Sequence, residues 1–296
     1  MNRERILEVV LTKLGVALLI ITASGAWAQQ SAPPASDQTP TTALVSGAPK
    51  AAQCSAPAFD QQSVALFEQQ APNGDAAAQC GLGMMHYIGQ GMPQDYTQAA
   101  LWFRKAAERG NAEAQYFLGL LYHDGQGVPQ NYIQAAVWWR KAAEQGDAGA
   151  QYSLGYLYCH GQGVPQDYTQ AAGWYQKAAE QGNADAQFGL GSLYGGGFGV
   201  PQDYTQAVAW FRKASEQGNA EAQYLLGLTY LFNRGVPLDY AEAYFWLDLA
   251  AAGKPSDVEQ AAKFRDQAAS HLTPTDLSRA QERARKWFEA HQAKPQ

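Results

Sequence analysis

Residues 111–146 read NAEAQYFLGLLYHDGQGVPQNYIQAAVWWRKAAEQG, and residues 147–182 read DAGAQYSLGYLYCHGQGVPQDYTQAAGWYQKAAEQG. The two stretches agree at most positions without a gap, so the chain repeats itself every 36 residues. A repeat of this length is typical of a solenoid, in which each repeat packs only on its neighbours. The period therefore predicts the fold before any single residue is considered.

The same pattern extends in both directions along the 296-residue chain. A Leu-Gly pair and a tryptophan keep the 36-residue step in five predicted repeats, which are 75–110, 111–146, 147–182, 183–218 and 219–253. The Leu-Gly pairs are Leu82-Gly83, Leu118-Gly119, Leu154-Gly155, Leu190-Gly191 and Leu226-Gly227, and the tryptophans are Trp102, Trp138, Trp174, Trp210 and Trp246.

Each repeat is predicted to form two antiparallel helices, because the helix ends carry chemical signals. The first helix follows an Asp or Asn such as Asn111, whose side chain can cap a helix N-terminus. It ends near a glycine such as Gly125, since glycine adopts the left-handed conformation easily. The second helix follows Asn131, and Gln134 stands three residues later, at the spacing of a capping box.

The recurring tryptophans are predicted to be core residues. At the helical period Trp138 shares a face with Ala135 and Ala142. Residues that every repeat retains are expected to pack one repeat on the next, so we interpret the tryptophans as core rather than as a sugar-stacking surface. A glycine in mid-helix, such as Gly119, costs about 1 kcal/mol relative to alanine. We therefore expect it to make room for a neighbouring tryptophan or helix backbone.

The motifs A-x-x-x-L-G-x-x-Y, G-x-G-V-P-x-D-Y, A-x-x-W and K-A-A-x-x-G follow one another within the repeats. Through these motifs residues 74–253 resemble the Sel-one-like repeat (SLR) family, a relative of the tetratricopeptide repeats. The resemblance implies an all-α fold, a right-handed α-solenoid of helix-turn-helix repeats. The sequence departs from the motifs at His86, Asn233 and Leu249, which replace a tyrosine, a glycine and a lysine.

The first 28 residues have the features of a signal peptide for export. The basic residues Arg3, Arg5 and Lys13 precede the uncharged run 14–27. The small residues Ala26 and Ala28 predict cleavage before Gln29. The run is shorter than the ~20 residues that a membrane-spanning helix needs. We therefore expect a mature protein without a membrane span, located in the periplasm or outside the cell. The alternative is an inner-membrane protein anchored by an uncleaved signal.

The remaining flanks are expected to serve the repeats. Residues 29–57 are rich in Ala, Pro, Ser, Thr and Gln and are predicted to form a disordered leader. Residues 58–73 are expected to form a degenerate cap helix, and residues 254–296 capping helices, because a solenoid needs polar-faced ends.

The three cysteines are expected to meet an oxidising compartment after export. Cys54 lies in the predicted flexible leader, from which it can reach Cys80 in the first repeat. We predict a disulfide between these two residues, worth about 3 kcal/mol in the chain-entropy model. Cys159 is then left as a free thiol.

Composition and motifs argue against several classes of function. The net charge of -6 argues against binding to nucleic acid. No metal-ligand spacing, phosphate loop or nucleophile motif occurs outside the repeat pattern, so no catalytic residue, metal or cofactor is predicted. We interpret His123, Cys159 and His160 as variable residues at helix ends rather than as metal ligands.

An enzymatic function is the alternative that the family resemblance offers. Some cysteine-rich SLR proteins are described as binding or hydrolysing β-lactams, which would imply a cell-wall-directed or β-lactam hydrolase or inhibitor. Those proteins have a cysteine pair in each repeat, and this chain does not. It also lacks a Ser-x-x-Lys arrangement at a helix start, which would supply an activated nucleophile.

The variable positions of the first helices are the candidate binding surface. Four columns spaced i, i+4, i+7 and i+11 vary while their neighbours stay constant, so one stripe of each first helix is free of packing constraints. By resemblance to tetratricopeptide-like solenoids, this stripe lines a concave face that binds a protein or peptide partner. An idle solvated surface is the alternative.

We call these positions the first-helix stripe. The predicted partner-binding residues are Glu113, Phe117, Leu120, Asp124, Ser153, Tyr156, His160, Glu221, Leu225, Leu228 and Phe232. Among them Phe117, Tyr156, Leu225 and Phe232 are expected to be exposed large apolar groups, which a partner would cover. Resemblance to exported bacterial SLR proteins implies roles in envelope complexes, signalling or host contact.

Overall fold

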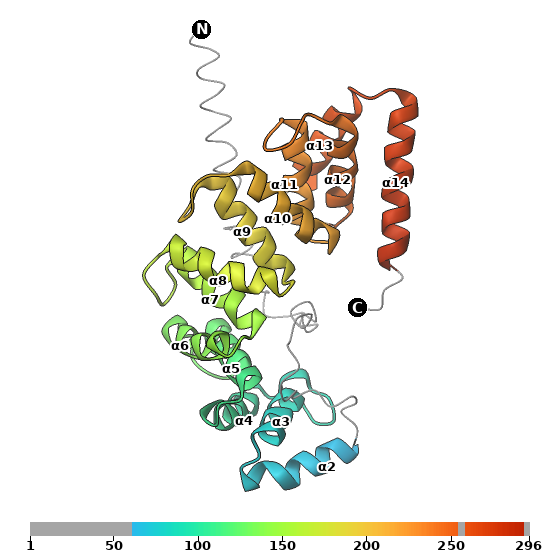
Figure 1. Ribbon diagram of the computed structural model, residues 1–296. Helices are drawn as coiled ribbons and strands as arrows, with labels where there is room; N and C mark the ends of the chain where they lie inside the picture. Colours follow the sequence, from blue (N-terminus) through green and yellow to red (C-terminus); the bar gives the residue numbers. More distant parts are fainter. Residues whose placement is uncertain (1–60, 254–257, 293–296) are drawn as a thin grey trace. The chain divides into compact units, whose positions relative to one another are not determined.

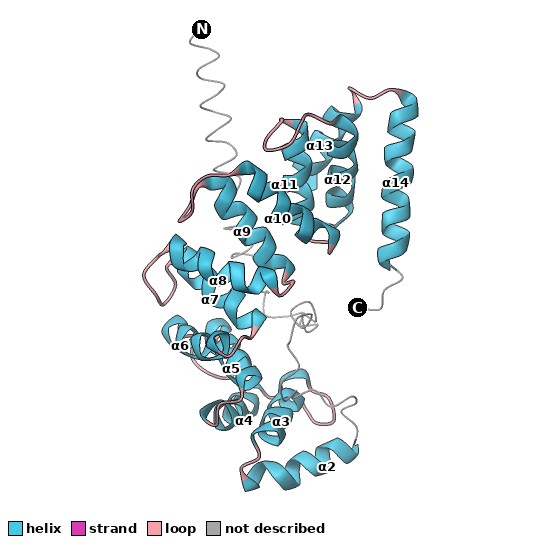
Figure 2. Cartoon of the chain, viewed as in Figure 1, coloured by secondary structure: helices cyan, strands magenta, loops and turns pink. Residues whose placement is uncertain are grey.

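A computed structural model of the chain describes residues 61–253 and 258–292. Every regular element within these ranges is a helix (Figures 1 and 2). The described residues fall into two compact units, which we call the N-terminal unit (61–183) and the C-terminal unit (184–292). The predicted all-α solenoid of helix-turn-helix repeats is confirmed. The predicted signal peptide, leader and Cys54 lie outside the described residues.

The N-terminal unit contains one helix that precedes the repeats and three helix pairs. In each pair the first and second helices pack along one another, and α4 and α6 also contact the first helix of the next pair, α5 and α7. The elements are α2 (Gln61–Gln70), a 3-10 turn (Ala71–Asn73), α3 (Ala76–Ile88), α4 (Tyr96–Glu108), α5 (Ala112–Asp124), α6 (Tyr132–Glu144), α7 (Ala148–His160) and α8 (Tyr168–Glu180).

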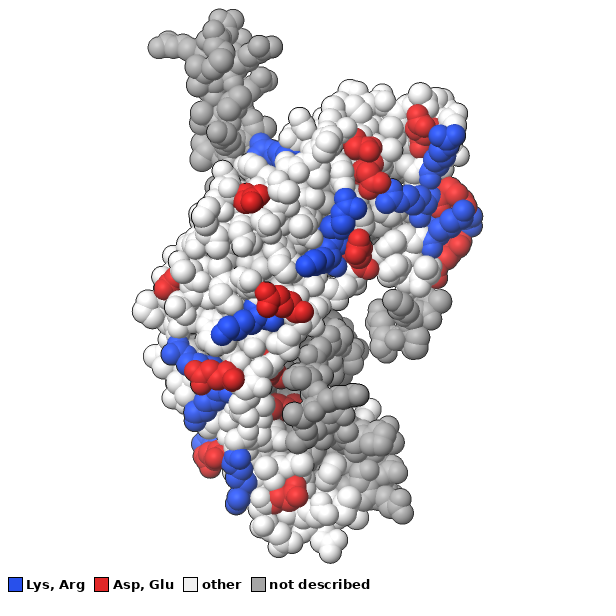
Figure 3. Space-filling model, viewed as in Figure 1, with Lys and Arg blue, Asp and Glu red and all other residues white. Residues whose placement is uncertain are grey.

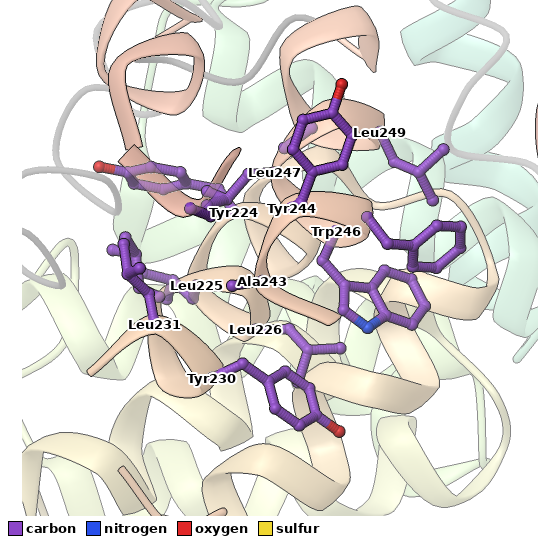
Figure 4. Packing of buried hydrophobic residues seen from close by; sticks show 14 of the residues in the cluster. Tyr224, Leu225, Leu226, Tyr230, Leu231, Ala243, Tyr244, Trp246, Leu247 and Leu249 are labelled. Atoms are coloured by element: carbon purple, nitrogen blue, oxygen red, sulfur yellow. The ribbon is translucent and has the colours of Figure 1, made fainter. Parts of the chain in front are cut away.

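The C-terminal unit contains two helix pairs and two further helices. Both further helices pack against the last second helix, α12. The elements are α9 (Ala184–Gly196), α10 (Tyr204–Glu216), α11 (Ala220–Leu231), α12 (Tyr240–Gly253), α13 (Val258–Ala269) and α14 (Pro274–Gln292). Their buried side chains form one core, in which Tyr224, Leu226, Trp246 and Leu247 meet (Figure 4).

The helix ends follow the predicted chemistry. The side-chain oxygen of Asn111 accepts a hydrogen bond from the Ala114 amide at 2.8 Å, a type of cap worth about 1 kcal/mol. The first helix ends at Gly125, which has a φ of 71°. In the last repeat Asn233 takes the equivalent position with a φ of 55°. Asparagine tolerates this conformation better than most residues, so the departure from the motif keeps the same turn.

The glycine in the middle of each first helix makes room for a side chain of the second helix. A Cβ atom added at Gly119 would lie 2.5 Å from the Trp139 ring, and one added at Gly155 would lie 2.7 Å from the Tyr175 ring. Neither distance is compatible with packed atoms. The glycines therefore make room for a large side chain, as expected, but that side chain follows the recurring tryptophan in the sequence.

The recurring tryptophans are half-buried in four repeats, so the prediction that they form the core is wrong there. Trp139 is buried, and its indole Nε1 donates a hydrogen bond to the Tyr116 carbonyl at 3.0 Å. Trp138 is half-buried, and the ammonium group of Lys141 lies 4.2 Å from its ring centre. The same stacking joins Lys105 to Trp102, Lys177 to Trp174 and Lys213 to Trp210. Of the five recurring tryptophans, only Trp246 is buried.

Trp139 and not Trp138 is buried because of the angular position of each residue on the helix. The side chains of α6 that are buried are Ala135, Ala136, Trp139, Ala142 and Ala143. These five residues span one face with Trp139 at its centre, whereas Trp138 lies about 100° away. The two alanine pairs were the signal in the sequence that identifies the core position.

Within each unit, a buried glutamine of the first helix connects successive repeats. The amide nitrogen of Gln115 donates to the Ala107 carbonyl in the preceding second helix at 3.0 Å. Its amide oxygen accepts a hydrogen bond from Gln145, at the end of the second helix of its own repeat, at 2.8 Å. Gln151 is bonded in the same way, to Ala143 and Gln181. We call this arrangement the glutamine relay; it satisfies a polar group that would otherwise be costly to bury.

Trp139→Ala is predicted to destabilise the protein far more than Trp138→Ala. The first substitution leaves a cavity in the core and should lower the free energy of unfolding by about 3–5 kcal/mol. The second removes a half-buried ring and its stacked lysine, and should cost about 1–2 kcal/mol. Chemical denaturation of both variants measures the difference. Equal losses would show that the two rings contribute equally to the core.

The same substitution at two helical glycines is predicted to have opposite effects. Gly119→Ala forces the new methyl group into the Trp139 ring and should cost about 1–3 kcal/mol. Gly173→Ala, in the interior of α8, places its methyl group where no atom lies within 4 Å. It should stabilise the protein by about 0.5–1 kcal/mol, because alanine favours the helix. The denaturation midpoints of the two variants measure these changes in stability. Stabilisation by Gly119→Ala would contradict the proposed packing role of Gly119.

Candidate functional site

The first-helix stripe lies on α5, α7 and α11, but most of its large apolar side chains are buried. Phe117 is 7% exposed and Tyr156 is 9% exposed, and Leu225 is buried as well. The expectation that these three residues are exposed is therefore wrong. Phe232 is exposed, as expected.

Phe117 is buried because it fills the junction between two repeats. Its ring stacks on Phe103 of the preceding second helix, with the centroids 5.3 Å apart. It also contacts the ring of Tyr87 at 5.5 Å, on the preceding first helix. Phe117 is therefore part of the packing between the first and second repeats.

Tyr156 is held by its neighbours on α7 and α5. Its ring stacks on His160, with the centroids 4.0 Å apart, and lies 6.4 Å from the ring of His123. The Nδ1 atom of His160 lies 2.9 Å from the Tyr156 carbonyl oxygen. Burial raises the pKa of Tyr156 to about 12, so the phenol is neutral at physiological pH.

The stripe residues on α11 are covered by the end of the C-terminal unit. Leu225 and Leu228 belong to its hydrophobic core. The ring of Phe232 makes an edge contact with Phe264 of α13, at a centroid distance of 5.7 Å. Glu221 is half-buried. α13 therefore occupies part of the stripe in the last repeat.

The accessible part of the stripe is its polar part in the N-terminal unit. Asp124 is exposed, whereas Glu113, Leu120, Ser153 and His160 are half-buried. All five lie on α5 and α7, which the ring contact between His123 and Tyr156 places side by side. The surface offers two carboxylates, a hydroxyl and an imidazole, and no lysine or arginine. These groups can accept or donate hydrogen bonds to an extended segment, and they favour a basic one.

A cavity of about 390 Å³ opens beside the first repeat, where the glutamine relay is interrupted. Arg109 stands where later repeats have Gln145 and Gln181, and the buried amide oxygen of Gln79 accepts no hydrogen bond. The lining residues are Ala71, Pro72, Gln79, Lys105, Glu108 and Arg109. The cavity was not predicted from the sequence, although Arg109, at a position where later repeats have glutamine, was its signal.

The cysteines differ in their chemistry. Cys80 is buried and disulfide-bonded, and Cys159 is a half-buried free thiol. Cys54 lies outside the described residues, so its pairing with Cys80 stays a prediction. Burial raises the pKa of Cys159 from 9.0 to about 11, and the hydrogen bond with Tyr175 offsets this only in part.

Two further properties bear on the type of site. In the described ranges, no three His, Cys, Asp or Glu side chains are grouped in a way that could hold a metal ion. No helix of residues 61–253 and 258–292 combines the length and the apolar character needed to cross a bilayer.

Cys159 is predicted to react slowly with iodoacetamide in the folded protein. At pH 8 a pKa near 11 in place of 9.0 lowers the thiolate fraction by about 100-fold. The rate should rise about tenfold per pH unit until the thiol ionises, and it should increase at once in denaturant, where the pKa returns to its ordinary value. Mass spectrometry that resolves the labelled site measures this. A folded-state rate at pH 8 equal to the denatured-state rate would refute it.

The sequence and the fold match one repeat family. The profile described as "Sel1 repeat" matches residues 76–111, 112–147, 148–183, 184–219, 220–255 and 268–290. The last match falls on the end of α13 and on α14, which we predicted only as capping helices. A search of curated proteins finds no match.

Two solved structures share both the fold and a substantial part of the sequence. One is a protective antigen present in uropathogenic Escherichia coli strains, which displays an SLR fold; it is 34% identical over 78% of this chain, with a TM-score of 0.66. This chain spans 49% of that protein's length. The other is a Sel1 repeat protein from Oxalobacter formigenes, 32% identical over 78% of this chain and 93% of its own, with a TM-score of 0.65. With repeat matches over most of its length, the chain belongs to the Sel1 repeat family.

Proposed function

We propose that this protein is an exported scaffold that binds a protein or peptide partner through its first helices, in envelope complexes, signalling or host contact. Sel1 repeats are in general protein-interaction modules. One observation carries the proposal. The residues common to the repeats are used in packing, whereas the accessible polar residues of α5 and α7 are those that differ between repeats.

The packing contacts account for the recurring residues one by one. The mid-helix glycine and the following ring join the two helices of a repeat, and the glutamine relay joins one repeat to the next. Arg140 also reaches from α6 to the Tyr158 hydroxyl of α7 at 2.6 Å. Asp124, Ser153 and His160 take part in none of these recurring contacts. Asp124 instead pairs with the imidazole of His123 at 2.6 Å, and His160 stacks on Tyr156, so their contacts are particular to single repeats and they can give the surface its specificity.

The charge of the stripe indicates the kind of partner. Its predicted residues include the carboxylates of Glu113, Asp124 and Glu221 and no lysine or arginine. Electrostatic complementarity therefore favours a segment with lysine or arginine side chains. Burial of Phe117 and Tyr156 leaves little apolar surface there, which favours a polar contact of moderate affinity over a hydrophobic one.

Export is supported by the basic start, the uncharged run and the small residues before Gln29. The similarity to a protein that is a protective antigen supports a location outside the cytoplasm and a role in host contact. The periplasm and the extracellular space both fit. An uncleaved signal that holds the protein at the inner membrane is the alternative.

Reversing the charge of the stripe is predicted to abolish partner binding without unfolding the protein. The full chain and the variant Asp124→Lys/Ser153→Lys are used to capture proteins from envelope extracts, and the matched control is Thr205→Lys, an exposed residue on α10. At least one protein should be captured by the wild type and the control and be reduced tenfold or more by the stripe variant.

Thermal melts check that all three proteins are folded, and sequencing of the purified mature protein should begin at Gln29. If the stripe variant captures the same proteins in the same amounts, the first helices are not the binding surface. If the intact Met1 sequence is found in the cytoplasm, export is refuted, whatever the capture shows.

A further inference from the structure

Helix α14 covers the outer face of the second helix α12. The guanidinium group of Arg283 lies 3.8 Å from the Phe245 ring centre and pairs with the Glu242 carboxylate. Phe245 and Leu249 are fully covered. α14 contributes the buried small residues Ala280 and Ala284 to this contact. Figure 4 shows Trp246 and Leu249 within the resulting core. The chain itself thus shows what fits this face of a second helix: an amphipathic helix with alanines toward it.

The same face is open on the second helices α4 and α6. Leu101 and Val137 stand at the repeat position of Phe245, and they are 46% and 43% exposed. Ile133, one turn earlier on α6, is 61% exposed. Other repeats have a threonine at the position of Ile133, namely Thr97, Thr169 and Thr205. We call Leu101, Ile133 and Val137 the outer apolar patch. Ile133 and Val137 share one face of α6, and Leu101 has the matching position on α4. Exposed large apolar groups of this kind mark a surface that another chain covers.

The charges around the patch differ from those on α12. Helix α12 carries two acidic residues and no basic one, and α14 carries four basic residues against three acidic. Lys and Arg lie beside Asp and Glu on α14 (Figure 3). Helices α4 and α6 together carry four basic residues and two acidic. Glu242 is replaced there by Gln98 and Gln134. Arg283 of α14 therefore has a carboxylate partner on α12, whereas the same position on α4 and α6 offers none.

Two lysines are held next to the patch. Leu249 of α12 is replaced by Lys105 in α4 and by Lys141 in α6. Their ammonium groups lie 3.9 and 4.2 Å from the ring centres of Trp102 and Trp138, which fixes the charges on this face. A helix that covers the patch must bring carboxylates to these positions.

We propose that the outer apolar patch binds an acidic amphipathic helix of a partner protein, in the way that α14 binds α12. This surface lies on second helices and is distinct from the first-helix stripe of the proposed function. One surface can therefore fail a test while the other passes it. A second copy of this chain is disfavoured as the occupant, because its own α14 directs Arg283 at such a face and already covers α12.

The test uses two peptides with the sequence of α14, residues 274–292. One has the natural sequence and the other carries Arg279→Glu, Arg283→Glu, Arg285→Glu and Lys286→Glu. Fluorescence anisotropy measures the affinity of each labelled peptide for the full chain at low salt. The acidic peptide should bind at least tenfold more tightly than the natural one, and added salt should reduce the difference.

Variants of the full chain locate the site. Ile133→Glu/Val137→Glu should weaken binding of the acidic peptide tenfold or more. Ile133→Thr/Val137→Ala should weaken it several-fold, and this variant carries residues that other repeats have at these positions, so the fold tolerates them. Leu238→Glu, at an exposed leucine in the C-terminal unit, and Asp124→Lys should leave binding unchanged. Equal binding of the two peptides, or unchanged binding to Ile133→Glu/Val137→Glu, overturns the proposal. So does loss of binding with Asp124→Lys.

Discussion

In every repeat a side chain of the second helix lies directly against the backbone of the first, over a glycine. The Trp139 ring occupies the space that a Cβ atom of Gly119 would need, and the same relation holds for Gly155 and Tyr175. A glycine in mid-helix is unfavourable by itself, by about 1 kcal/mol. It is retained because a larger residue there would separate the two helices. The alanines on either side of the ring complete this close contact. The other contacts of the solenoid require the helices to be at this distance.

The helix ends and the fold class could be predicted because their signals are local. A capping side chain such as Asn111, or a left-handed glycine such as Gly125, acts on backbone atoms within a few residues. The choice between Trp138 and Trp139 depends instead on the direction of each side chain. Neighbouring residues on a helix point about 100° apart. The recurrence of Trp138 has another cause, its stacking with Lys141 at the edge of the core.

The first-helix stripe was only partly predictable, because variation in a column does not always mean freedom from packing. At the repeat position of Phe117 the first repeat has Gly81, and a Cβ atom there would lie 2.6 Å from the Phe67 ring of α2. Phe117 instead stacks on Phe103. Such a column varies because its residue must fit the side chain that the preceding helix places against it: a glycine where Phe67 fills the space, and a phenylalanine that stacks on Phe103. This relation joins residues far apart in the sequence, so a single sequence does not reveal it. Asp124 varies at the exposed end of α5, where its carboxylate pairs with the imidazole of the adjacent His123 and fills no space between repeats.

The glutamine relay allows whole repeats to be added or removed without leaving new buried polar groups unpaired. The amide nitrogen of Gln115 donates to a carbonyl of the preceding repeat, and its amide oxygen accepts from Gln145 of its own repeat. Each added repeat brings a first-helix glutamine together with the glutamine that donates to its amide oxygen, as Gln145 does to Gln115, so it pairs its own acceptor. The amide oxygen of Gln79 is unpaired because Arg109 stands where later repeats have this donor. Lengthening or shortening the array by whole repeats therefore does not change the number of buried polar groups that lack a hydrogen bond. Gene duplication can thus alter the length of the molecule without creating a new polar defect in its interior.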